Sequence, residues 1–433
     1  MRSLERFIHV QAMSGVVLLA AAAIALAWAN SPWGGVYEAV LATRFELQVG
    51  RWSVGTSLKF LVDDVLMALF FFVIGLELRR RMHGGELGTL REAALPIVAA
   101  LGGMVVPAAI YVMAVGLFGD ASVGWGVPVS TDTAFALGVL ALLGSRIAPN
   151  VRVLLLAIAI IDDVVAVLVI AIFYSSRIDP RGICVAVAGI SAVLILQRFG
   201  VRRVASYVIP AMAVWIGIWW AGIHPTFAGI IVGLLTPART WYGHEGLADA
   251  ARQHIDVIDR PASNGGTRLR DLARSRLELR RAHREAVSPV ERIEAALHTW
   301  TAFAIMPVFV FANAGIAFGQ VDVAAAPRLA AGVVAGLVVG KLAGIVLASA
   351  GAVKLGIARL PIGVTWRGVA VVGAVAGIGF TMALFIANLA FAERPDLRDV
   401  ARAAILCSSA VSVVLALLVG RAVPSKCGTD TRR

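Results

Sequence analysis

Apolar runs of roughly 17 to 25 residues, long enough for a helix to cross the hydrocarbon core of a bilayer, recur along the whole chain. Of its 433 residues, 59% are hydrophobic and 15% are charged. Soluble domains contain about 45–50% apolar and about 25% charged residues. We therefore expect an all-α polytopic membrane protein with about twelve transmembrane helices.

One membrane domain then accounts for residues 1–433. Between and after the helices we expect an external loop with a hairpin at 30–57, a cytoplasmic loop at 237–296 and a cytoplasmic tail at 424–433. The expected helices cover residues 12–29, 58–78, 94–118, 123–143, 150–174, 182–198, 205–221, 223–236, 297–318, 329–351, 368–391 and 400–421.

The basic residues orient these helices. Arginines gather after the second, fourth, sixth and tenth expected helices and in the tail, whereas the loops after the third and seventh contain no Lys or Arg. Cytoplasmic loops carry the excess of basic residues, so both termini are expected in the cytoplasm. The formal charge of +12 is spread over short loops without a basic face, which argues against a nucleic-acid partner.

Two adjacent acids interrupt the apolar run from Val151 to Phe173: Asp162 and Asp163. A charged side chain at the centre of a membrane span costs several kcal/mol on most scales, so an acid there indicates function. Neighbouring helical residues point about 100° apart, so the two carboxylates do not share a face. A purely structural pair would need two buried partners. The pattern favours an ion site.

A second polar interruption falls inside the fourth expected helix, at Pro128–Ala134. Pro128 removes a backbone donor, and Ser130, Thr131 and Thr133 compete for backbone hydrogen bonds, which predicts a break. Asp132 beside the break suits the N-terminus of a half-helix. A kinked helix with a capping Asp is the alternative, and it also leaves Asp132 in the interior.

Lys341, in the tenth expected helix, is one of only four lysines among 39 basic residues. A lysine can lose its proton when buried, whereas arginine stays charged. The residue lies too far from either helix end for easy snorkelling to the membrane surface. We expect a buried partner among Asp132, Asp162 and Asp163.

Gly377, Gly379 and Thr381 predict a second break, in the eleventh expected helix. Two interrupted helices in corresponding positions point to an inverted-repeat transporter, with helices three to five and ten to twelve as the related halves. Glycines also serve simple close helix packing, which leaves that interpretation open. His224, between the seventh and eighth helices, is expected to be a turn histidine at the outer surface.

Several motifs together resemble the bacterial NhaA-type Na⁺/H⁺ antiporters over nearly the whole chain. This family is itself a known example of inverted repeats, so the topology is not an independent deduction. The matching stretches are Ala27–Pro32, Asp64–Leu78, Ser130–Gly138, Ile160–Asp163, Phe309–Gly315, Gly340–Ile345 and Gly377–Ile386.

The resemblance implies a secondary active antiporter, not an enzyme, which exchanges cytoplasmic Na⁺ or Li⁺ for external protons at two protons per sodium ion. Such exchange is electrogenic, serves pH and sodium homeostasis, and needs no cofactor beyond the transported ions. The resemblance also implies the bacterial inner membrane as location and a homodimer contact through the hairpin at 30–57.

The same resemblance assigns roles to individual residues. Asp163 matches the principal ion- and proton-binding acid, and Asp162 the acid that pairs with the lysine at Lys341. Thr131 and Asp132 match broken-helix residues beside the site, so Na⁺ is expected at this group of residues, chiefly at Asp163 and Asp162. Positions associated with the cytoplasmic funnel and pH response are matched by Asp64, Glu77, Arg80 and Glu294.

Two residues depart from the family pattern: Arg81 stands where a second acid is common, and Ala295 where a histidine is common. Two other classes of protein also bury acids. An intramembrane aspartyl protease needs its acids on facing helices, which the adjacent Asp162 and Asp163 do not supply. A passive cation channel uses acids for selectivity, but a buried Lys341 opposes cation permeation.

Overall fold

The computed structural model describes residues 2–49, 52–84, 90–175, 178–201, 203–238 and 288–422. This part of the chain is helical apart from one two-stranded hairpin. Its α-helices and strands up to the end of α10 are α1 (Arg2–Ala29), α2 (Gly34–Ala42), β1 (Arg44–Val49), β2 (Trp52–Ser57), α3 (Leu58–Phe60), α4 (Met67–Gly84), α5 (Leu90–Val115), α6 (Thr133–Leu142), α7 (Pro149–Phe173), α8 (Pro180–Arg198), α9 (Ala205–Trp220) and α10 (Thr226–Leu235). The later ones are α13 (Pro289–Trp300), α14 (Met306–Ala314), α15 (Pro327–Ala335), α16 (Lys341–Lys354), α17 (Trp366–Ala376), α18 (Phe380–Ala390) and α19 (Pro395–Arg421).

Within the described residues, three π-helical segments join helices into longer rods, and four short 3₁₀ segments connect others. Leu61–Leu66 joins α3 to α4, Thr301–Ile305 joins α13 to α14, and Gly336–Gly340 joins α15 to α16. The 3₁₀ segments are Ser122–Val129, Gly144–Arg146, Phe318–Gln320 and Val323–Ala325.

Every one of the twelve segments expected to cross the membrane contains helix. Six helices of the described residues are long and apolar enough to span a bilayer, or up to nine if each of three bent pairs is one span. The all-α membrane fold is confirmed, and the two breaks expected in the fourth and eleventh segments are present. The number of twelve crossings stays a prediction.

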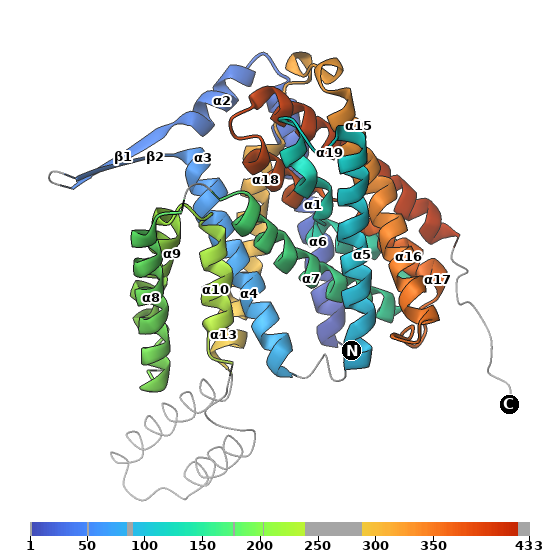
Figure 1. Cartoon of the computed structure of the whole chain (residues 1–433), viewed down its shortest axis with the longest axis horizontal. Coiled ribbons are helices and arrows are strands. Elements are labelled where there is room, and N and C mark those ends of the chain that lie inside the picture. The colour runs from blue at the N-terminus through green and yellow to red at the C-terminus, as the bar shows by residue number, and fades with distance from the viewer. Residues whose placement is uncertain are drawn as a thin grey trace, which may run out of the picture.

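The polar segment at 30–57 has a defined shape. The chain bends by 113° between α1 and α2 and then forms the antiparallel hairpin β1–β2, with Arg44 opposite Ser57 and Val49 opposite Trp52. Figure 1 shows the hairpin projecting away from the helices. The chain re-enters the bundle through α3, whose first turn is capped by the hydroxyl of Ser57.

The last residues of the segment expected as a loop at 237–296 are helical, because α13 begins at Pro289. Ser288 and Glu291 form a capping box: the Ser288 hydroxyl accepts from the Glu291 N–H at 3.2 Å, and the Glu291 carboxylate accepts from the Ser288 N–H at 3.3 Å. Residues 239–287 of the expected loop and the tail at 424–433 lie outside the described residues.

The helices form two packed groups (Figure 1). α8 packs on α9 at one side, and α10 links this pair to α4. The larger group contains a single hydrophobic core that includes α1, α5, α7 and α14 to α19. Residues 371–376 of α17 and 380–387 of α18 are all buried, so the second broken helix lies at the centre of this core.

Candidate functional site

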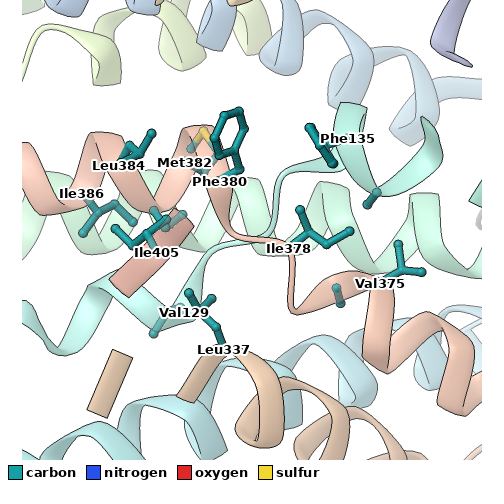
Figure 2. Close-up of a cluster of buried hydrophobic side chains, with 14 of the residues drawn as sticks. Val129, Phe135, Leu337, Val375, Ile378, Phe380, Met382, Leu384, Ile386 and Ile405 are labelled. Carbon is teal, nitrogen blue, oxygen red and sulfur yellow. The ribbon is translucent and has the colours of Figure 1, made fainter. Parts of the chain in front are cut away.

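Two broken helices cross at the centre of the molecule. The 3₁₀ segment Ser122–Val129 meets α6 at a bend of 42°, and α17 meets α18 at a bend of 44°. Their non-helical segments, 130–132 and 377–379, pass each other in Figure 2. The first lies between Val129 and Phe135, and the second, which contains Ile378, lies between Val375 and Phe380. The Asp132 N–H donates to the Ile378 carbonyl at 2.7 Å, and the Thr131 hydroxyl donates to the Ala376 carbonyl at 2.9 Å.

Asp132 caps two half-helices at once. One carboxylate oxygen accepts from the Phe135 N–H in the first turn of α6 at 3.0 Å. The other accepts from the N–H of Thr381 at 3.2 Å and from its hydroxyl at 2.6 Å, in the first turn of α18. Helix N-termini carry partial positive charge and unpaired N–H groups. A single buried acid therefore stabilises both N-termini that the two breaks create.

The sequence explains why the helices stop here. The 3₁₀ segment ends at Val129, one residue after Pro128, and Ser130 then takes an extended backbone conformation. On the other chain segment the approach of neighbours demands glycine at Gly377, where an added Cβ would lie 2.5 Å from the Leu337 carbonyl oxygen and 2.8 Å from the Ser412 hydroxyl. The breaks are thus set by local sequence and fixed by packing.

Lys341 is paired with Asp162. The lysine Nζ donates to an Asp162 carboxylate oxygen at 2.8 Å, and both residues are 1% exposed. Lys341 begins α16, where the rod α15–α16 returns from its π-helical segment to α-helix. The depth of the lysine alone left three acids open as its partner, the family resemblance pointed to Asp162, and the structure pairs it with Asp162.

Asp163 has a different environment from its neighbour. It is 6% exposed, and its carboxylate accepts a hydrogen bond from the Thr133 hydroxyl at 3.3 Å. It lines a cavity of about 110 Å³ together with Asp132, Thr133 and Thr381. The cavity therefore presents two carboxylates and two hydroxyl groups, all hard oxygen donors of the kind that suit an alkali or alkaline-earth cation.

The same cavity extends along α4 and α13 to a set of charged residues, which we call the cavity mouth. These residues are Glu77, Arg80, Glu294 and His298. Arg80 pairs with Glu294 at 3.2 Å, and its side chain is 43% exposed, so the mouth reaches solvent. Arg81, which stands where the family often has an acid, pairs with Glu77 at 2.8 Å within α4.

Beyond the site, three fully buried aromatic rings form a cluster. The rings of Phe71 and Phe309 lie 6.1 and 5.9 Å from that of Phe385, and all three residues are 0% exposed. Phe385 lies one turn of α18, about 6 Å, beyond Thr381. We refer to Phe71, Phe309 and Phe385 as the aromatic plug.

A polar network lies on the far side of the plug, and sequence reasoning missed it. Asn313 donates to the Asp63 carboxylate at 2.6 Å and to the Phe309 carbonyl at 3.1 Å, and Asn388 donates to the Asn313 side-chain oxygen at 2.7 Å. Arg402 donates to the carbonyl oxygens of Asn313 and Gly315. Only the position of Asn313 inside an apolar motif could have drawn attention to it.

Asp64 also lies beyond the plug, and not in the cavity. It comes within 3.5 Å of the His224 Nε2 atom, and the His224 ring lies 5.3 Å from that of Phe385. The expectation of a surface histidine was wrong, since the His224 side chain is only 11% exposed. Glu77, Arg80 and Glu294 thus gather at the cavity mouth, whereas Asp64 does not join them.

These features define a class of protein. Acids buried at the crossing of two broken helices, a compensating buried lysine, a cavity toward one end and a closed plug toward the other are the parts of a secondary active transporter.

The chain belongs to the Na⁺/H⁺ antiporter 1 family, whose profile matches residues 5–419. It is 52% identical over 429 residues to the Na⁺/H⁺ antiporter NhaA 2 of Sorangium cellulosum, covering 98% of this chain and 91% of that protein. Identity to the NhaA 2 antiporter of Myxococcus xanthus is 49%, covering 97% of this chain and 89% of that protein. Identity to the NhaA antiporter of Janthinobacterium sp. is 47%, covering 96% of this chain and 92% of that protein.

The chain is accordingly a multi-pass membrane protein that exchanges Na⁺ for H⁺ and is not an enzyme. Both ions are its substrates, and the family carries no cofactor.

Proposed function

We propose that Asp163 is the carboxylate at which Na⁺ and protons compete. The observation that carries this assignment is the different environment of two adjacent acids. Lys341 compensates Asp162 at 2.8 Å, whereas Asp163 lines the cavity and receives one hydroxyl hydrogen bond from Thr133. Asp163 is thus the acid whose negative charge is left for a cation or a proton to neutralise.

Asp132 and the hydroxyl groups of Thr133 and Thr381 complete the proposed Na⁺ site, because they line the same cavity. We assign Thr131 a positioning role, since its hydroxyl is engaged with the Ala376 carbonyl at the crossing. Asp162 acts mainly through Lys341: a change in their geometry alters the proton affinity of the coupled pair, and so adds a second titrating unit beside Asp163.

Exchange follows from competition. Na⁺ entering the cavity displaces protons from Asp163, and protons arriving from the opposite side displace Na⁺. Because one set of carboxylates cannot hold both, each ion leaves only when the other replaces it. Two proton-binding units, Asp163 and the Asp162–Lys341 pair, agree with electrogenic exchange of two protons per Na⁺. Li⁺, which also prefers hard oxygen donors, is the expected alternative substrate.

The direction of exchange rests on the basic residues. Arg79, Arg80 and Arg81 lie at the end of α4 that carries the cavity mouth. By the positive-inside bias this end faces the cytoplasm, as do both termini, and the hairpin β1–β2 lies outside, where it is free to contact a second copy. We assign the protein to the bacterial inner membrane on this basis, with Glu77, Arg80 and Glu294 as the cytoplasmic funnel.

The test is proton movement in everted vesicles. Adding NaCl dissipates a preformed proton gradient in wild-type vesicles, and Asp163→Asn abolishes this response although the variant inserts at normal levels. Asp322→Asn is the matched control, because Asp322 only caps a short exposed turn. Full exchange by Asp163→Asn would reject the assignment, and Na⁺ flux without proton movement in the wild type would indicate a channel.

A further inference from the structure

A groove opens between the C-terminal ends of α6 and α19, away from the ion cavity. Its volume is about 400 Å³, and its lining residues are Leu142, Leu143, Arg146, Leu417 and Arg421. Leu142 is 73% exposed, so one wall faces outward from the helices. The groove ends at the same point as α19, whose last turns are coloured red in Figure 1.

Basic residues surround this groove. Asn150 donates to the Ile362 carbonyl at 2.7 Å, and Arg367 donates to the Ala422 carbonyl at 3.0 Å. These two bonds bring the start of α7, the α16–α17 connection and the end of α19 to one end of the bundle. The segments 141–155, 353–368 and 415–422 contain no Asp or Glu. Their basic residues are Arg146, Arg152, Lys354, Arg359, Arg367 and Arg421.

The two arginines of the groove differ from their neighbours Arg152 and Arg367. Those two guanidinium groups are hydrogen-bonded to carbonyl oxygens. The guanidinium groups of Arg146 and Arg421 have neither an ion pair nor a hydrogen bond among the described residues, and both residues are exposed. Two exposed guanidinium groups without a protein partner among the described residues therefore line one groove whose remaining walls are leucine side chains.

We propose that this groove binds an anionic phospholipid, with Arg146 and Arg421 on its phosphate and the leucines against its acyl chains. Guanidinium groups match phosphate oxygens with paired hydrogen bonds. Basic pockets between helices at the cytoplasmic face attract anionic headgroups, and the apolar wall excludes a fully hydrated anion. The groove volume falls in the usual range for a small-molecule site, about 300–1,000 Å³.

A lipid held there would link two elements of the ion site. α6 begins at Thr133 beside Asp163 and ends at the groove. α19 contacts the other break, because a Cβ at Gly377 would lie 2.8 Å from the Ser412 hydroxyl. Leu143 already packs against Gly420, where an added Cβ would lie 2.5 Å from a Leu143 methyl carbon. The lipid thus restrains how far the end of α6 moves against α19.

The experiment measures lipid binding by native mass spectrometry of the purified full chain, with phosphatidylglycerol, phosphatidylcholine and inorganic phosphate as probes. Arg146→Gln/Arg421→Gln is compared with Lys354→Gln/Arg359→Gln, which removes the same charge from the same end outside the groove. We expect phosphatidylglycerol to bind wild type and the control pair equally, and to bind the groove variant at least tenfold more weakly. Phosphatidylcholine and phosphate should bind poorly to all three.

A further variant separates shape from charge. Leu142→Trp fills the groove, keeps both arginines, and should also weaken phosphatidylglycerol binding; unchanged melting temperatures without lipid show that both groove variants are folded. Equal losses in the groove and control pairs would show diffuse surface charge instead of a site. Inorganic phosphate binding as tightly as the lipid would show a free-anion site. Either outcome overturns the proposal.

Discussion

Adjacent residues perform different tasks at this site because a helix turns about 100° per residue. Asp162 points to Lys341 on α16, and Asp163 points to the cavity beside Thr133. The sequence alone predicted that Lys341 is buried with one of three acids. Only the family resemblance pointed to Asp162, because the physical answer depends on how α7 and α16, nearly 180 residues apart, are rotated against each other.

Removing one residue of the Lys341–Asp162 pair should lower the stability of the fold more than removing both. Lys341→Ala leaves a 1% exposed carboxylate without compensation, and breaking a buried pair in this way costs about 3–5 kcal/mol. Asp162→Asn/Lys341→Ala removes both charges and should recover much of that loss. Melting temperatures of the two single variants and the double variant in detergent provide the measurement. Additive losses would show that the pair does not stabilise the fold.

At the level of elements, the breaks were predictable and their crossing was not. Pro128 and the polar residues after it predict that the fourth helix stops, and Gly377 and Gly379 predict the same for the eleventh. Each break is a local property. The crossing depends on bonds such as that from the Asp132 N–H to the Ile378 carbonyl, between residues about 250 positions apart, and no local pattern encodes it.

Asp132 should contribute about twice as much stability as an ordinary helix cap, because it caps both α6 and α18. One N-cap contributes about 0.5–2 kcal/mol, so Asp132→Ala is expected to cost about 1–4 kcal/mol. Thr365→Ala is the matched control, since Thr365 caps only α17, at its exposed end, through the Gly368 N–H at 3.2 Å. Thermal unfolding of both variants measures the ratio. Equal losses would contradict the double cap.

On the scale of the whole molecule, the rods that contain α4, α14 and α18 each carry one residue of the aromatic plug and one residue of the polar network beyond it. Along α4 with its π-helical segment, Asp63 is followed by Phe71 of the plug and then by Glu77 of the cavity mouth. On α14 and α18, Phe309 and Phe385 of the plug are followed by Asn313 and Asn388 of the far network. The family resemblance placed Asp64 in the funnel, and the turn sequence placed His224 at the outer surface. Neither a motif match nor a local pattern shows how neighbouring helices pack, and that packing puts Asp64 beside His224 and outside the cavity.

The aromatic plug should decide from which side the site is reached. In a variant without Cys184, Cys407 and Cys427, Ile160→Cys places a thiol in the cavity. A membrane-impermeant thiol reagent should label it from the side of the cavity mouth and not from the other side. Adding Phe385→Ala removes the central ring, which contacts both Phe71 and Phe309, and should allow labelling from both sides. Labelling from both sides with the plug intact would place the barrier elsewhere.

Competition at one carboxylate sets how the whole transporter depends on pH. Protonated Asp163 does not hold Na⁺, so lowering the pH below the range where the site titrates should weaken the apparent Na⁺ affinity. The half-maximal Na⁺ concentration should rise by about tenfold per pH unit for one competing proton and about a hundredfold for two. The measurement is Na⁺-dependent proton movement in everted vesicles between about pH 6 and 9.

Competition at Asp163 and a separate pH switch at the cavity mouth predict different changes in the maximal rate and in the half-maximal Na⁺ concentration. Competition changes the half-maximal Na⁺ concentration and leaves the maximal rate unchanged at saturating Na⁺. If the charged residues of the cavity mouth instead act as a separate switch, the maximal rate falls with pH while the half-maximal concentration stays fixed. Glu77→Gln and Glu294→Gln, which remove acids from the mouth and leave Asp163 and Asp132 in place, should then move the pH profile. If competition alone sets the pH dependence, the half-maximal Na⁺ concentration of both variants changes with pH as steeply as that of the wild type. The reason is that Asp163 and Asp132, the acids that exchange the ions, are still present.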